Sequence, residues 1–168
     1  MRSQYTAIME QLVERLASSA AYEGTLEGCS EDEIDEIRET QGVKRLPRMY
    51  REFLLHMGRH TGGLEGYLGF EITYPGVCEF KRMSFDLLRQ PDIFVMTHIA
   101  DGDCAFYFHI DEDDPIVYWV GYDRRPEFVE FNVLETKDCG SLSNWLIDVV
   151  GDFIGDPQLP PNPIDKEE

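Results

Sequence analysis

The sequence predicts an α+β fold, in which an antiparallel meander sheet of about four to six strands packs against N-terminal helices and a closing C-terminal helix. Apolar residues recur at helical spacing in the first half of the chain and again near its end. Between these segments lie short β-branched and aromatic runs, separated only by brief turns. Links this short favour antiparallel neighbours over parallel βαβ units. The 168 residues suit one domain over 1–155, with an extended, acidic, proline-rich tail over 156–168.

The first predicted helix spans residues 3–18 and is either part of the domain or an N-terminal extension of it. Its apolar stripe recurs at helical spacing. The residues of that stripe are Tyr5, Ile8, Met9, Leu12 and Leu16. Residues 18–29 are predicted to form a connection.

Residues 30–58 predict two helices that meet at a corner. Ser30 and Glu33 have the spacing of a capping box, in which each side chain accepts a hydrogen bond from the other residue's backbone. Gly42 suits the end of the first helix, and Pro47 suits the start of the second. The predicted buried faces hold Ile34 and Ile37 in the first helix and Tyr50, Phe53, Leu54 and Met57 in the second.

The next segment is rich in glycine and predicts mostly loop. Residues 59–76 contain five glycines, with a short strand expected over 67–73. A short helix is predicted over 79–89. The side chains expected to point inward from it are Phe80, Met83, Leu87 and Leu88.

Four short runs and one helix complete the predicted fold. The runs are β-branched or aromatic and are bounded by turn residues. They span 93–99, 105–110, 115–122 and 127–133. The helix spans about 141–154 and carries an apolar stripe of Leu142, Trp145, Leu146, Val149, Val150 and Phe153.

No motif in the sequence indicates catalysis, a cofactor or a metal site. There is no G-x-S-x-G elbow, no Walker A loop and no G-x-G-x-x-G. His56 and His60 have a chelating i, i+4 spacing, but Gly58 between them is expected to end the helix. His98 and His109 are expected to be half-buried and paired with neighbours. The four cysteines form no CxxC pair and are interpreted as free thiols.

Negative charge is concentrated in the second half of the chain. The net charge is −18; residues 1–100 carry 16 acidic and 11 basic side chains, whereas residues 101–168 carry 17 acidic and 4 basic ones. Such a field repels nucleic acid and anionic membranes and attracts basic protein surfaces. Solubility is the alternative explanation of the same charge. The N-terminus has no uninterrupted apolar h-region, so a cytoplasmic location is expected, and no run is long enough to span a membrane.

The helical corner, the meander and the last helix together resemble the SUKH superfamily, the SMI/KNR-like domain. The resemblance covers about residues 28–153. The residues that carry it are Ile34, Ile37, Glu39, Gly42, Leu46, Pro47, Tyr50, Phe53, Leu54, Gly58, Asp114, Pro115, Ile116, Val117, Trp145 and Leu146. The glycine-rich stretch after Gly58 and the acidic tail depart from the family pattern.

The resemblance implies a function without catalysis. Many bacterial SUKH proteins are immunity proteins, which bind a cognate toxin, often a nuclease, and neutralise it inside the producing cell. The implied partner is therefore a protein with a basic surface. No cofactor, metal or nucleic acid is implied, and the oligomeric state stays open between a monomer and a weak dimer.

The predicted partner-binding surface lies in the acidic second half of the chain. Exposed carboxylates would steer a basic partner toward it, and aromatic side chains would anchor the contact. The predicted residues are Asp101, Asp103, Asp111, Glu112, Asp113, Asp114 and Asp123, with Tyr118 and Tyr122 as exposed aromatic anchors.

Two other classes of function stay open at this point. SUKH-like domains also serve as intracellular scaffold or regulatory modules, with no toxin involved. A small hydrolase is the third interpretation, because 33 acidic residues allow many carboxylate pairs. A hydrolase would need a deep pocket that holds acids of raised pKa.

Overall fold

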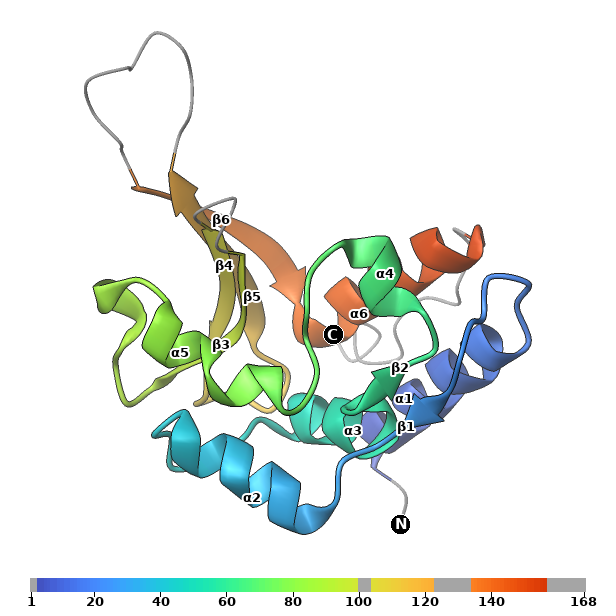
Figure 1. Ribbon diagram of the computed structural model, residues 1–168, viewed down its shortest axis with the longest axis horizontal. Coiled ribbons are helices and arrows are strands. Elements are labelled where there is room, and N and C mark those ends of the chain that lie inside the picture. Colours follow the sequence, from blue (N-terminus) through green and yellow to red (C-terminus); the bar gives the residue numbers. More distant parts are fainter. Residues whose placement is uncertain (1–2, 100–103, 123–133, 157–168) are drawn as a thin grey trace, which may run out of the picture.

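The computed structural model describes residues 3–99, 104–122 and 134–156, and it confirms the predicted α+β class. The main sheet lies at one side of the molecule, and α1, α3 and α6 lie together at the other (Figure 1). The helices are α1 (Gln4–Ala17), α2 (Glu31–Thr40), α3 (Arg48–Met57), α4 (Leu64–Leu68), α5 (Phe80–Met83) and α6 (Leu142–Ile154), with 3₁₀ turns at Gly76–Cys78 (η1) and Asp86–Leu88 (η2). The strands are β1 (Leu26–Glu27), β2 (His60–Thr61), β3 (Ile93–Ile99), β4 (Cys104–His109), β5 (Ile116–Tyr122) and β6 (Leu134–Ser141).

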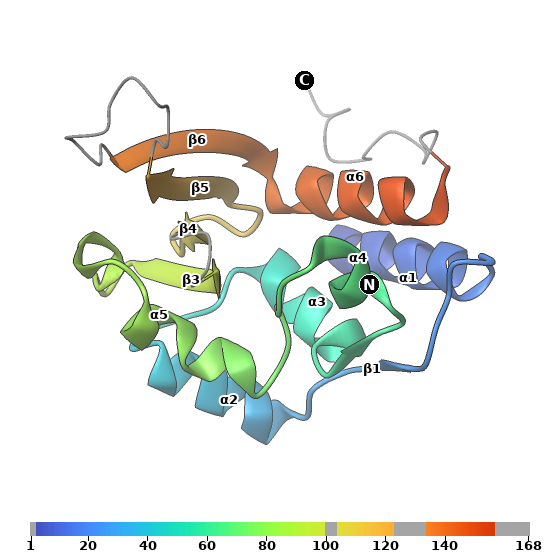
Figure 2. The ribbon, with the colours of Figure 1, turned by 45° about the horizontal axis from the view of Figure 1, so that its top comes forward.

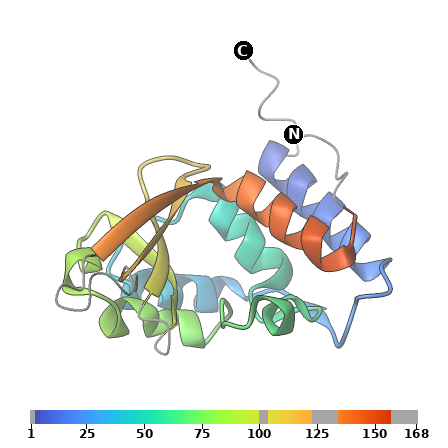
Figure 3. The ribbon, with the colours of Figure 1, turned by 90° about the horizontal axis from the view of Figure 1, so that it is seen from above.

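Three helices form the helical half of the core. α1 packs against both α3 and α6, and Figure 3 shows the three side by side. The predicted stripe of α1 is buried at Ile8, Met9, Leu12 and Leu16, whereas Tyr5 is only partly buried. α1 thus contributes to the common core rather than standing apart from it.

The predicted corner is confirmed down to its caps. The Ser30 backbone N–H donates to the Glu33 carboxylate at 2.9 Å, and the Glu33 N–H donates to the Ser30 hydroxyl at 3.3 Å. Gly42 follows the end of α2 with φ of +63°, a conformation that side chains with a Cβ rarely adopt. Pro47 takes the N-cap position, one residue ahead of α3. All of the predicted inward positions of α2 and α3 are buried.

We expect Glu33 to make the stability of this corner depend on pH. The Ser30 N–H and the Arg59 guanidinium bind its carboxylate and lower the pKa of Glu33 below 4.5. Its stabilising effect is therefore present above pH 4.5 and is lost as the pH falls through the lower, folded-state pKa. Glu33→Gln should lower the free energy of unfolding by about 0.5–1 kcal/mol at pH 7. Urea unfolding at a series of pH values should show this difference vanish in acid; a constant difference would contradict the assignment.

Two predictions in the middle of the chain are wrong. Residues 67–73 form no strand, because Gly69 ends α4 with φ of +74° and the following backbone bonds to a side chain instead. The Glu65 carboxylate accepts from the Ile72 N–H at 2.7 Å and from the Thr73 hydroxyl at 2.9 Å. A segment whose hydrogen-bond donors are bound to a carboxylate cannot use them to pair with a neighbouring strand.

The predicted helix over 79–89 is also interrupted. Ser84 adopts an extended conformation and separates α5 from η2, which changes the phase of the side chains that follow. Phe80 and Leu88 are buried as predicted, whereas Met83 and Leu87 are 51% and 46% exposed.

The main sheet is the predicted antiparallel meander, in the order β3-β4-β5-β6. β3 has the predicted bounds, and β4 and β5 lie within one residue of them. The predicted run 127–133 lies outside the described residues. β6 was not predicted, because this edge strand exposes four consecutive residues and so shows no apolar alternation. β1 and β2 form a separate two-stranded pair within the connections.

The two faces of the main sheet meet different surroundings, as Figure 2 shows with the strands seen edge-on. The inner face meets the helices: Phe94 and Phe108 pack against Tyr50 of α3, and Phe106 packs against Trp145 of α6. Tyr107 and His109 alternate with these residues along β4 and therefore belong to the outer face. Near β3 that face is covered in part by Phe85, whose ring meets His98 and Tyr122.

The β3 edge of the sheet is closed by two buried polar side chains. Gln41, 1% exposed, donates to the carbonyls of Val77 and Val95 and accepts from the Val95 N–H, so that its amide acts as a short extra strand. Lys81, 8% exposed, donates to the carbonyls of Gln41, Gln90 and Ile93 at 2.5–2.8 Å. These two residues, the β3 lock, satisfy backbone groups that would otherwise be buried without partners.

Candidate protein-binding face

The acidic turn between β4 and β5 contains two kinds of carboxylate. Asp111 and Glu112 are exposed, whereas Asp113 and Asp114 are partly buried. Asp113 forms ion pairs with Arg45 and Arg48, and its carbonyl accepts from the N–H of Met49 at the start of α3. These contacts tie the turn to the helical half of the molecule. The sequence placed all four carboxylates in the binding surface; the structure gives Asp113 a role inside the fold.

Asp114 binds the first turn of α6. Its carboxylate accepts from the Ser143 backbone N–H at 2.9 Å and from the Ser143 hydroxyl. The N-terminus of a helix leaves such N–H groups without intrahelical partners, and its dipole favours a negative charge there. Asp114 therefore also holds the fold together, because it connects the sheet to the last helix.

We expect Asp114→Ala to lower the free energy of unfolding by about 1–2 kcal/mol, since it removes a charged cap from a partly buried helix end. Asp111→Ala, three residues away in the same turn, is the matched control and should change that free energy by less than about 0.5 kcal/mol. Chemical denaturation of both variants checks the contrast. Equal losses at the two positions would contradict the division of this turn into structural and free carboxylates.

Aromatic side chains gather on the outer face of the sheet near this turn. Tyr107 and Tyr118 are register partners on β4 and β5 and stack with ring centroids 5.5 Å apart. The His109 ring meets Tyr118 edge-on at 6.2 Å, and its Nδ1 lies 3.3 Å from the carboxylate of Asp92. We call Tyr107, His109, Ile116 and Tyr118 the aromatic platform.

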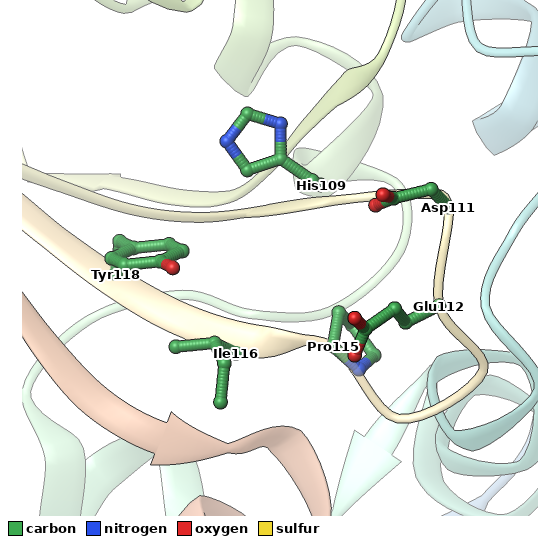
Figure 4. Close-up of a pocket in the computed structure, with 6 residues that line it drawn as sticks. All are labelled: His109, Asp111, Glu112, Pro115, Ile116 and Tyr118. Atoms are coloured by element: carbon green, nitrogen blue, oxygen red, sulfur yellow. The ribbon is translucent and has the colours of Figure 1, made fainter.

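A hollow of about 160 Å³ opens on this platform (Figure 4). It is lined by His109, Asp111, Glu112, Pro115, Ile116 and Tyr118. The His109 and Tyr118 side chains lie toward one end of the hollow in Figure 4, and the carboxylates of Asp111 and Glu112 lie toward the turn. The hollow therefore joins an aromatic wall to two negative charges.

Four exposed carboxylates surround the platform. Asp92 lies against His109, Asp111 and Glu112 lie at the turn, and Asp138 is the register partner of Tyr118 on β6. Register partners present their side chains on the same face of a sheet, so Asp138 adds to this side. These four residues are called the carboxylate rim. Lys137 points to the opposite face, where its ammonium lies 5.1 Å from the Trp119 ring centroid.

The basic side chains of the described residues are largely neutralised within the fold. Every arginine that the structure describes forms an ion pair with a carboxylate. Among them, Arg45 and Arg48 pair with Asp113, and Arg51 pairs with Glu31. Lys81 is buried against carbonyls. Arg45 and Arg48 share the one carboxylate of Asp113, and Arg45 also donates to the carbonyl of Asp111 at 3.3 Å, so their positive charge offsets part of the negative field at the turn.

The remaining predicted site residues divide into two groups. Asp101, Asp103 and Asp123 lie outside the described residues. Tyr118 and Tyr122 are partly buried rather than exposed, because Tyr118 stacks on Tyr107 and Tyr122 packs against Phe85.

Five members of the site were missed from the sequence, namely Asp92, Tyr107, His109, Ile116 and Asp138. The sequence signal that could have found Ile116 was its position two residues before Tyr118 on a predicted strand, which places both side chains on the same face of the sheet. The pairing of His109 with a neighbour, expected from the sequence, is confirmed by Asp92.

Other chemistry has little support among the residues that the structure describes. They contain no group of three or more His, Cys, Asp or Glu residues arranged to hold a metal ion. His56 bonds to the carbonyl of Glu52, and His60 lies 3.7 Å from Glu27, so the two histidines have separate partners. No helix among the described residues has the length and apolar character that a membrane span needs.

None of the three cysteines with a shifted pKa has the lowered pKa of an activated thiol. Burial raises the pKa of the Cys29 thiol to about 12, and burial also raises the pKa values of Cys78 and Cys139. A nucleophilic cysteine requires the opposite shift, since the thiolate is the reactive form.

Fold and site together define an acidic α+β domain that presents an aromatic platform inside a carboxylate rim. A scan against models of protein families finds no match for this chain, and searches of the curated proteins and of the solved structures find none either. The resemblance to the SUKH superfamily therefore stays a prediction from the sequence.

Proposed function

We propose that this chain is a non-enzymatic immunity protein that binds a cognate bacterial toxin, such as a nuclease, through the aromatic platform and its carboxylate rim. The observation that carries the proposal is the position of the exposed carboxylates around the partly exposed rings of His109 and Tyr118. The immunity role is proposed from the resemblance to SUKH proteins. The exposed carboxylates and aromatic rings of this face support a basic protein as the partner.

The physical argument rests on the two components of a tight interface. A carboxylate rim raises the association rate of a basic partner through long-range attraction, and this effect weakens as salt is added. Aromatic side chains in a desolvated centre supply most of the binding energy. A nuclease must present positive charge to phosphate, so its substrate-binding surface is complementary to this face.

The proposal is tested first by capture of the partner. The purified chain is used as bait, at low and at high salt, against lysate of its own source. We expect one large basic protein, whose capture is weakened by salt, and we expect the chain to inhibit its toxic activity. Recovery of ordinary signalling proteins without any inhibition would contradict immunity and favour a scaffold or regulatory module.

Charge reversal should then locate the contact. We expect Asp111→Lys combined with Glu112→Lys to lower the association rate constant about 10-fold or more at low salt, with a smaller effect at high salt. Asp148→Lys combined with Asp152→Lys is the matched control, because these exposed residues of α6 change the net charge equally. Stopped-flow or surface-based kinetics measures both; equal slowing by the two pairs would show that total charge, and not this face, controls association.

A further inference from the structure

We propose that the hollow on the aromatic platform receives a single arginine side chain from the partner protein. This inference rests on the proposed function and names the chemical group that the same site recognises. The hollow combines a charge, a ring surface and an apolar wall within about 160 Å³, and an arginine side chain needs all three.

The negative end of the hollow is available to a cation. Asp111 and Glu112 are exposed, and neither carboxylate bonds to another of the described residues. Asp113 and Asp114, the next two residues, bind α3 and α6 and thereby fix the position of the turn. Two unneutralised carboxylates on a fixed turn suit a guanidinium, which donates up to five hydrogen bonds in one plane.

The opposite end suits the flat face and the aliphatic stem of the same side chain. Tyr118 is held in place by its stacking on Tyr107, and His109 is held by its contact with Asp92. A guanidinium stacks on aromatic rings, and its three methylenes pack on apolar surface such as Ile116 and Pro115. Because these rings are oriented before binding, little conformational entropy is lost on contact.

The chemistry of the hollow selects against other occupants. An anion is repelled by the carboxylate rim, and a neutral polar group leaves both carboxylates without a countercharge. A lysine ammonium is compact and strongly hydrated, so it satisfies the carboxylates but gains less from the rings. Another hollow among the described residues, of about 280 Å³, is lined by glycines, Thr25, Thr61, His60, Glu23 and Glu65, and its lining has no Tyr, Phe or Trp on which a guanidinium could stack.

The inference is tested with small probes on the intact chain, independently of any partner. N-acetyl-arginine N-methylamide is titrated into the isotope-labelled protein, and the lysine and citrulline equivalents are titrated in parallel. Citrulline has nearly the shape of arginine without its charge. We expect saturable NMR shifts at His109, Ile116 and Tyr118 with a dissociation constant on the order of millimolar for arginine. We expect at least about threefold weaker binding for lysine and no saturable binding for citrulline.

Two variants assign the site. Asp111→Asn combined with Glu112→Gln keeps the shape of the turn and should abolish the arginine shifts without changing the folded spectrum elsewhere. Tyr118→Leu should weaken arginine about threefold or more while leaving lysine nearly unchanged. Shifts spread over the whole acidic surface, or equal affinities for arginine and lysine, would overturn the inference. If the inference fails in this way, capture of a salt-sensitive basic partner would still support the proposed function. If arginine binds in the hollow but no partner is captured, only the proposed immunity function would be contradicted.

Discussion

Replacing Gln41 with alanine is expected to lower the free energy of unfolding by about 3–5 kcal/mol, one of the largest effects of any single substitution in this chain. The Gln41 amide accepts from the Val95 N–H at 3.1 Å and donates to the carbonyls of Val95 and Val77 at 2.8 and 2.7 Å. Removing it leaves three buried backbone groups without partners, and each costs about 1–3 kcal/mol. Urea denaturation followed by circular dichroism measures the loss.

Two controls separate this effect from general damage to α2. Glu39→Ala, at an exposed position of the same helix, should change stability by less than about 0.5 kcal/mol. Gln41→Glu keeps the shape but points a carboxylate at two carbonyls, so it should be as damaging as alanine at pH 7. Burial raises the pKa of such a carboxyl in the fold, so the ionisation penalty should be full above that raised pKa and should disappear as the pH falls to the unfolded pKa of about 4.3. A loss of less than about 1 kcal/mol in the free energy of unfolding for Gln41→Ala would contradict the stabilising role of Gln41 at the edge of β3.

The sequence predicted best those elements whose signals are local. Caps such as Ser30 and Glu33 lie three residues apart, and the stripe of α3 recurs within eight residues, so neither depends on the rest of the chain. The β3–β5 meander was equally accessible, because its strands are apolar and its described turns are short. β6 was missed for the opposite reason, since Glu135, Lys137 and Asp138 are typical of a loop unless a neighbouring strand is known.

The β3 lock could not be predicted from the sequence, because its contacts join distant segments. Gln41 lies 54 residues from Val95 and 36 from Val77. A glutamine and a lysine near helix ends normally lie in solvent, and nothing in their neighbours indicates burial. Tertiary structure alone shows that these two side chains replace a missing strand.

The candidate site was predicted in part. The concentration of acidic residues pointed to the β4–β5 turn, but charge alone could not separate Asp111 and Glu112 from Asp113 and Asp114. That separation depends on Arg45 and on the N-terminus of α6, both far away in the sequence. The aromatic platform required the strand register, which brings Tyr107 opposite Tyr118.

Lys81→Met is expected to lower the free energy of unfolding by about 2–4 kcal/mol, because methionine keeps the apolar stem but donates no hydrogen bond. Burial lowers the pKa of Lys81, and the charge of Asp92 opposes that shift. Three carbonyls also accept from the ammonium, which stabilises its charged form at the buried edge of β3. Chemical denaturation measures the loss, with Arg82→Met on the exposed side of α5 as the control.

The two halves of the lock should be coupled, since the Lys81 ammonium donates to the carbonyl of Gln41. Either substitution alone loosens the same edge of β3 and lets water reach the carbonyls that the other residue serves. The double variant should therefore lose about 0.5–2 kcal/mol less than the sum of the single losses. Strict additivity would mean that Gln41 and Lys81 stabilise β3 independently. Coupling would instead show that both side chains act as one polar substitute for the strand that β3 lacks.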